Sequence, residues 1–253
     1  MGIALALLLA PAASACMPEG ADPRDAQLAA ALDATTLKLA DGSVLKLAGI
    51  IAPRGGEPFA KEAEAGLAAL AGRGRLRLYP VETAEDRYGR MRAQAYVVPE
   101  AGAPYWLQGA MLEGGFARVF TTADARLCAA ALLAREGWAR KAGRGLWALP
   151  GYAVLMADAI PAAAIGSFAI VEGRVAKAEL RADRGYIDFG RNWRSGFTVE
   201  LDKPDLALFR RDGYDIDALR GQSVRVRGWL ERISGPMMRL THPEQLERLG
   251  SGP

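Results

Sequence analysis

The stretch at residues 32–54, Leu-Asp-Ala-Thr-Thr-Leu-Lys-Leu-Ala-Asp-Gly-Ser-Val-Leu-Lys-Leu-Ala-Gly-Ile-Ile-Ala-Pro-Arg, decides the fold of the first part of the chain. Two alternating runs, at residues 36–39 and 44–47, flank Asp41-Gly42. An Asp-Gly pair between alternating runs is the strongest short-range signal for a β-hairpin. The leucines of both runs predict one buried face. The apolar run that follows predicts a strand that enters a barrel interior and ends before the proline.

Aligned on Thr36 and Pro53, this stretch resembles the opening of staphylococcal-nuclease-like (thermonuclease) domains. The family pattern is Asp-Gly-Asp-Thr, a hairpin, Arg-Leu, and then Asp-(Thr or Ala)-Pro-Glu. The resemblance implies an OB-type five-stranded barrel with helices. It also implies where the catalytic groups of the family would fall: the second Asp, a metal ligand, on Thr35; the first Arg on Lys46; the second metal-binding Asp on Ile51; and the catalytic Glu on Arg54. The first Asp, which does not bind the metal, is kept as Asp33.

By this resemblance, the sequence keeps the structural pattern of a calcium-dependent nuclease but has other residues where the family has carboxylates. Calcium takes about six to eight oxygen ligands, with carboxylates balancing its charge. Thr35 offers one neutral hydroxyl, Ile51 offers no oxygen, and Arg54 adds positive charge. We therefore expect no bound metal and assign no catalytic residue. The alternative is a Ca²⁺-dependent phosphodiesterase with a rebuilt site that uses Asp33, Lys46, Glu57 and Arg90.

A second signature, Asp-(Arg or Lys)-Tyr-Gly-Arg, is matched in full at residues 86–90. By the resemblance, Arg90 occupies the position of the arginine that contacts the transition state. A guanidinium there would offer two parallel hydrogen bonds to a phosphate. The alternative is that Tyr88-Gly89 forms a tight turn and Arg90 is a solvated strand residue. The residues expected to contact a ligand in this domain are Lys46, Arg54, Tyr88 and Arg90.

The rest of the first domain follows from periodicity and from the same resemblance, which covers residues 30–147. We expect helices at residues 59–70, 107–113 and 124–141, and strands at 75–79 and 91–98. Gly115-Phe116 and Gly145-Leu146-Trp147 resemble further family positions.

The pattern changes to strands after residue 166, which predicts a second, OB-like barrel. The expected elements are strands at 168–175, 186–189, 197–201, 223–231 and 237–241, with helices at 203–219 and 243–249. Such barrels often bind single-stranded nucleic acid or sugars. Trp193 is a candidate stacking residue, and we expect Arg225 and Arg227 on the outer face as ligand-binding residues. The alternative is that Tyr186, Phe189 and Phe197 form barrel core.

Composition sets the outer limits of function. The chain has 253 residues, of which 51% are hydrophobic and 24% charged, so it can bury the cores of two domains. A net charge of +3 permits contact with anions but predicts no strong long-range steering of nucleic acid. Overall we expect a mainly β fold with helices (α+β).

The beginning of the chain predicts export. Residues 3–9 form a short apolar run, and Ala13-Ser14-Ala15 supplies the small residues that a signal peptidase recognises, although no basic residue precedes the run. The alternative is a buried N-terminal helix. The chain has two cysteines, so it can form at most one disulfide. Cys16 could instead carry a lipid, which would place the protein on a membrane, and Cys128 is expected as a small core residue of a helix.

These observations give a complete domain plan. We expect a signal peptide at residues 1–15, a linker at 16–29, the nuclease-like domain at 30–148, a second linker at 149–164 and the OB-like domain at 165–253. The single His242 precedes a proline, and no zinc spacing or phosphate loop occurs. The sequence thus predicts a non-catalytic protein of the periplasm or cell envelope. Its expected ligand is single-stranded nucleic acid or a nucleotide, or else an envelope protein or glycan.

Overall fold

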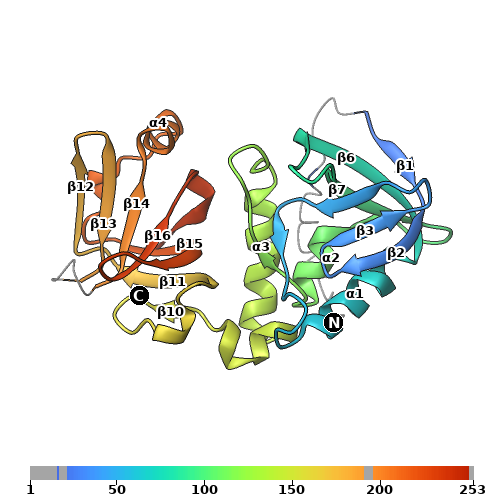
Figure 1. The fold of residues 1–253 in the computed structure, drawn as a ribbon, viewed down its shortest axis with the longest axis horizontal. Helices are drawn as coiled ribbons and strands as arrows, with labels where there is room; N and C mark the ends of the chain where they lie inside the picture. Colours follow the sequence, from blue (N-terminus) through green and yellow to red (C-terminus); the bar gives the residue numbers. More distant parts are fainter. Residues whose placement is uncertain (1–15, 17–21, 191–195, 251–253) are drawn as a thin grey trace, which may run out of the picture. The chain divides into compact units, whose positions relative to one another are not determined.

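The computed structural model describes residues 16, 22–190 and 196–250, which form two compact units (Figure 1). The first unit comprises the described residues up to Val119 together with Leu127–Gly145. The second comprises Phe120–Arg126 and the described residues from Leu146 onward. The predicted signal peptide and Trp193 lie outside the described residues. Within the described part, no helix is long and apolar enough to span a membrane.

The first unit is a curled antiparallel sheet closed by one parallel pair. Its strands are β1 (Arg24–Ala26), β2 (Leu28–Asp33), β3 (Thr36–Leu39), β4 (Val44–Leu47), β6 (Gly74–Glu85) and β7 (Met91–Pro99). They are ordered β1-β6-β7-β4-β3-β2, and β4 runs parallel to β7. β1 and β2 lie at the two ends of this order, but only Gln27 separates them in the chain. The sheet therefore closes on itself. Five strands therefore make an OB-type barrel, which confirms the predicted fold class.

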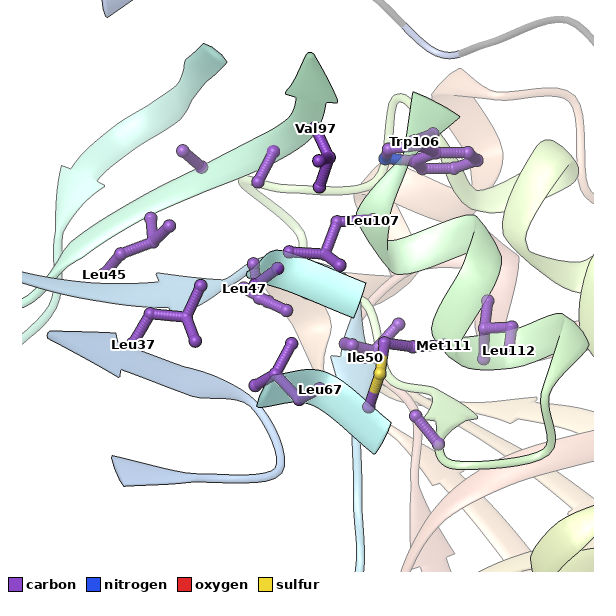
Figure 2. Packing of buried hydrophobic residues seen from close by; sticks show 14 of the residues in the cluster. Leu37, Leu45, Leu47, Ile50, Leu67, Val97, Trp106, Leu107, Met111 and Leu112 are labelled. Carbon is purple, nitrogen blue, oxygen red and sulfur yellow. The ribbon is translucent and has the colours of Figure 1, made fainter. Parts of the chain in front are cut away.

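The predicted hairpin is confirmed residue for residue. β3 and β4 have the expected bounds, and their leucines Leu37, Leu39, Leu45 and Leu47 are fully or almost fully buried. Figure 2 shows Leu37, Leu45 and Leu47 in the core with Leu67 of α1 (Ala60–Ala71) and Leu107 of α2 (Leu107–Glu113). The remaining elements are β8 (Tyr105–Trp106), which pairs with β7, the small β5 (Ile50–Ile51) and β9 (Arg118–Val119) pair, and α3 (Ala129–Lys141).

Two glycines of the first unit lie where the backbone path requires glycine. Gly115 and Gly145 both have left-handed φ, +69° and +57°. A Cβ at Gly115 would lie 2.1 Å from the carbonyl oxygen of Arg144, and one at Gly145 would lie 2.4 Å from the carbonyl oxygen of Gly115. The two backbones approach too closely for any side chain, so both positions require glycine.

The second unit repeats the path of the first. Its strands are β10 (Leu155–Met156), β11 (Phe168–Arg174), β12 (Lys177–Arg181), β13 (Arg184–Asp188), β14 (Thr198–Leu201), β15 (Ser223–Arg232), β16 (Pro236–Arg239) and β17 (Leu246–Leu249). The order is β10-β11-β15-β16-β14-β13-β12, with β14 parallel to β16. Only two residues separate β11 from β12 in the chain, although they lie near opposite ends of the strand order. This sheet therefore also closes on itself. Helix α4 (Lys203–Arg211) lies between β14 and β15 in the chain.

Several predicted bounds are corrected by tertiary contacts. The helix expected at 124–141 begins at Ala129, because residues 120–126 belong to the second unit. The helix expected at 203–219 ends at Arg211, where Gly213 takes a left-handed φ of +81°. The expected terminal helix is a short 3-10 turn, Pro243–Gln245, followed by β17, which pairs with β15. Strand β12 was not predicted, and the segment expected as a linker at 16–29 contributes β1 and the start of β2.

A disulfide joins Cys16 to Cys128, with the two Cα atoms 5.5 Å apart. Cys128 is buried at the start of α3, and the hydroxyl of Tyr96 donates a 2.8 Å hydrogen bond to the carbonyl oxygen of Cys16. The beginning of the described chain is thus attached to the first unit at two points. A cysteine in this bond has no thiol left for a lipid.

Candidate functional site

The turn between β2 and β3 holds Asp33 in a fixed orientation. Its Oδ1 accepts hydrogen bonds from the backbone N–H and the hydroxyl of Thr35, at 2.7 and 2.9 Å, and its Oδ2 accepts one from the hydroxyl of Thr36 at 2.7 Å. Asp side chains commonly close turns in this way. Asp33 therefore stabilises the turn with both oxygens, which leaves it little capacity to act as a base.

Lys46 of β4 reaches across the hairpin to this turn. Thr36 and Lys46 are directly opposed in the β3–β4 register. The Lys46 ammonium donates to the Thr35 hydroxyl and, at 3.3 Å, to the Thr36 hydroxyl, and its Nζ lies 3.9 Å from Asp33 Oδ1. A cation thus occupies the neighbourhood of Thr35, the position where the family resemblance places a metal-binding carboxylate.

Strand β5 and the loop after it carry Ile51 and Arg54, the other two positions where the resemblance places carboxylates. Ile51 is half-buried and pairs with Arg118 of β9. The backbone N–H of Arg54 donates a 2.8 Å hydrogen bond to Glu57 Oε2, and the N–H of Glu57 returns one to the carbonyl oxygen of Arg54. Glu57 is therefore engaged in closing its own turn.

The turn between β6 and β7 is organised by Asp86. Its Oδ1 accepts hydrogen bonds from the backbone N–H groups of Tyr88 and Arg90, at 2.9 and 3.0 Å. Its Oδ2 accepts 2.7 Å contacts from Nε and Nη2 of Arg90, a two-point ion pair. The Tyr88 ring is exposed, and the guanidinium carbons of Arg87 and Arg90 lie 5.2 and 5.1 Å from its centroid. Sequence reasoning missed the role of Asp86, although an Asp two residues before Tyr-Gly is a recognised turn signal.

Charged residues from these turns shift the pKa of Lys46. Burial lowers the pKa of its ammonium most. The negative charges of Asp33 and Asp86 oppose that change, and the positive charges of Arg90 and Arg54 lower the pKa further. The pKa of Asp33 is also lowered: burial opposes that shift, but the Lys46 charge and the hydrogen bonds from Thr35 and Thr36 outweigh it. A like charge makes the charged form of a group less favourable only when it lies nearby. The charges of Arg90 and Arg54 thus act on Lys46, and we call these three residues the basic cluster.

This cluster does not fit a calcium ion. The Thr35 hydroxyl already accepts a hydrogen bond from Lys46, the Ile51 side chain has no ligand atom, and Arg54 would repel a cation. Among the described residues, no group of three or more His, Cys, Asp or Glu side chains could hold a metal. The arrangement suits an anion such as a phosphate, which Lys and Arg bind through charge-assisted hydrogen bonds.

Residues 44–149 match the family model of the staphylococcal nuclease homologues. The match covers the hairpin strand with Lys46, the Asp86–Arg90 turn and the three helices of the first unit. The first unit is a staphylococcal-nuclease-like domain. A search of curated proteins found no significant match to the chain. The family assignment made from the hairpin and the Tyr-Gly-Arg signature is therefore confirmed.

Two candidate ligand residues of the second unit, Arg225 and Arg227, lie together on β15. Val224 and Val226 are buried in the barrel core, as the alternation predicted. Arg225 pairs with Glu172 and Glu247 on the neighbouring strands, and Arg227 pairs with Glu247. Arg227 is only 1% exposed, which corrects the expectation that it lies on an open outer face. Strand β17 and the turn before it account for this burial, since Gln245 also donates to the Arg227 carbonyl.

The aromatic residues of the second unit divide between core and surface. Phe197 is buried, and Phe189 packs against it with ring centroids 5.1 Å apart. Tyr186 instead lines a hollow on the outside of the barrel. The alternative that these aromatics form barrel core therefore holds for two of the three.

Proposed function

We propose that this is an exported, non-catalytic member of the thermonuclease family that binds a phosphate-bearing ligand, single-stranded nucleic acid or a nucleotide, at the mouth of the first barrel. The observation that carries the proposal is the hydrogen bond from Lys46 to Thr35, which puts a cation where the family resemblance places a metal carboxylate. Binding needs only positive charge at the phosphate. Cleavage would also need a metal or equivalent group to stabilise the charge that develops in the transition state.

The surface beside the basic cluster supports a single-stranded ligand. Tyr88 is 69% exposed and is flanked by two arginines. An exposed aromatic ring gives bases a stacking surface, and cations beside it track the backbone phosphates. The nuclease-like family assignment supports nucleic acid as the general ligand class.

Export is supported by the disulfide between Cys16 and Cys128. Disulfides persist in oxidising compartments such as the periplasm and are rare in the cytosol. The mass of the mature protein from an envelope fraction tests this proposal. The proposal is supported by the mass of a chain that begins at Cys16 and lacks the two hydrogens of the dithiol form. An intact N-terminus with two free thiols contradicts it.

Binding is tested by fluorescence anisotropy with a labelled single-stranded 12-mer at a series of salt concentrations. Three phosphate contacts would give a slope of log affinity against log salt of about −2. We expect Lys46→Met to lower the slope's magnitude by about 0.7. Lys141→Met, which removes an exposed charge at the end of α3, is the matched control and leaves the slope unchanged. A slope near zero would favour an envelope protein or glycan instead.

Catalysis is tested on the same oligonucleotide with and without Ca²⁺. We expect no cleavage above buffer. Calcium-stimulated cleavage that Arg90→Ala abolishes would overturn the non-catalytic proposal and favour the rebuilt site with Asp33, Lys46, Glu57 and Arg90.

A further inference from the structure

The two threonines of the β2–β3 turn connect Lys46 to both carboxylate oxygens of Asp33. The Thr35 hydroxyl donates to Asp33 Oδ1 at 2.9 Å, and the Thr36 hydroxyl donates to Oδ2 at 2.7 Å. Each hydroxyl also accepts a hydrogen bond from the Lys46 ammonium. A carboxylate can only accept and an ammonium can only donate, so the direction of every bond is fixed. These four side chains therefore form a closed hydrogen-bond network.

The network leaves one N–H of the ammonium for a ligand. An ammonium has three N–H groups, and the two threonines accept hydrogen bonds from two of them. Asp33 Oδ1 lies 3.9 Å from Lys46 Nζ, which is too far for a hydrogen bond. Within the described part of the chain, Lys46 has no third acceptor. Its side chain is 29% exposed, so a ligand can reach the remaining N–H.

The two hydroxyls are rigidly placed. Thr35 and Thr36 are 5% and 3% exposed, and Thr36 lies directly opposite Lys46 in the β3–β4 register. Two fixed acceptors determine the direction of the third N–H, because the ammonium is tetrahedral. A lysine side chain ordinarily loses conformational freedom when it binds a ligand. Here folding has already removed that freedom, which favours binding.

Closure of the turn does not itself need these hydroxyls. The backbone N–H of Thr35 already donates to Asp33 Oδ1 at 2.7 Å, and Asp33 and Thr36 are paired in the β2–β3 register. What the hydroxyls add is the contact with Lys46.

The ammonium needs these acceptors because of where it lies. Burial and neighbouring positive charges lower the pKa of Lys46, and neighbouring carboxylates oppose that change. A partly buried charge is stable only when hydrogen bonds replace its lost water. The threonines supply two acceptors, and a phosphate oxygen would supply the third.

We propose that Thr35 and Thr36 are positioning residues, which hold the Lys46 ammonium so that its third N–H meets one oxygen of the ligand phosphate. The phosphate is that of the proposed function, on which this proposal rests. The network itself can be measured without any ligand.

Binding of the labelled single-stranded 12-mer to the full chain gives the first test. Thr35→Val and Thr36→Val change no charge, yet each should weaken binding about fivefold, because Lys46 loses one of its fixed acceptors. The salt slope should stay at the wild-type value, since the number of phosphate contacts is unchanged. Thr35→Ser keeps the hydroxyl and should bind like the wild type. Thr198→Val is the matched control: it removes a hydroxyl that donates to Asp188 in the other barrel, and binding should not change.

An NMR titration of the Lys46 side chain gives a second test without ligand. The Lys46 signal is assigned by its absence from Lys46→Met. The pKa of Lys46 should be lower in Thr35→Val than in the wild type, because the ammonium has lost an acceptor that stabilises its charged form. Thr35→Ser should restore the wild-type pKa.

The two tests separate this proposal from the proposed function. If the wild type does not bind the 12-mer, or if Lys46→Met binds as tightly, the proposed function fails and the Lys46 pKa still tests the network. If Lys46→Met weakens binding but the folded valine variants bind like the wild type, the positioning role is overturned. A Lys46 pKa that is the same in both valine variants as in the wild type would also overturn it.

Discussion

The two barrels follow the same path but gather different sets of charged side chains. In each, the first strand is split, the third and fifth strands are parallel, and a helix lies between the third and fourth strands. In the first barrel the charges of Arg54 and Arg90 act on Lys46. The second places Asp188 and two more carboxylates on its outer face. A shared fold therefore fixes where side chains converge but not what they bind.

The barrels also differ in how a distant segment is attached. The first holds Cys16 by a disulfide and a hydrogen bond. The second holds Phe120–Arg126 by polar contacts: buried His242 bonds to Thr121 at 2.8 Å, and Arg126 pairs with Glu244 at 2.9 Å. One attachment responds to redox conditions and the other to pH, which provides ways to perturb each barrel separately.

The largest expected effect is loss of the disulfide. Cys16→Ser should destabilise the first barrel by about 2–5 kcal/mol, because the bond closes a long loop in the unfolded chain. The two cysteines are 112 residues apart. Denaturant titration followed by hydrogen exchange would localise the loss. Reductant should reproduce it in the wild type and add nothing in the variant; an equal loss in both barrels would contradict the comparison.

Acid should selectively weaken the second barrel. Burial lowers the pKa of His242 from 6.5 to about 4, with a further contribution from Arg126. The unfolded chain then binds more protons between these values, so stability present above pH 6.5 falls as pH drops toward 4, by about 3 kcal/mol in total. Hydrogen exchange at pH 7 and pH 4.5 measures this. His242→Asn should remove the pH dependence, and a first barrel that weakens as much would show that other groups are responsible.

A smaller loss of stability is expected at the β2–β3 turn of the first barrel. Asp33→Ala removes the acceptor that closes the β2–β3 turn and should cost about 1 kcal/mol. Chemical denaturation of the variant tests this. Asp22→Ala, which removes an exposed carboxylate outside the turn, is the control that separates the Asp33 contacts from a general loss of charge.

The smallest expected effect is a gain in stability. The corresponding β12–β13 turn contains Ala182 with a left-handed φ of +52°. Glycine adopts this conformation without strain, so Ala182→Gly should stabilise the second barrel by about 0.5–1 kcal/mol. Ala178→Gly in the adjoining strand is the control and should destabilise. A destabilised Ala182→Gly variant would indicate that the turn is not strained.

Much of the first barrel could be predicted because its signals are local. The β3–β4 hairpin depends on alternation and Asp41-Gly42 within twelve residues. β12 was missed because Lys-Ala-Glu-Leu-Arg lacks the β-branched and aromatic residues typical of strands. It is a strand because β13 pairs with it.

The sequence by itself determined the hairpin and the alternation of Val224 and Val226, because both are matters of residue type and short-range spacing. It also carries Thr35, Ile51 and Arg54 at the positions where the family resemblance places carboxylates. Tertiary structure alone decided that Arg227 is buried against Glu247, that Cys16 meets Cys128, and that Asp188 lines a hollow. These contacts join residues from about 10 to more than 100 positions apart. They depend on strand register and packing, which no local pattern specifies.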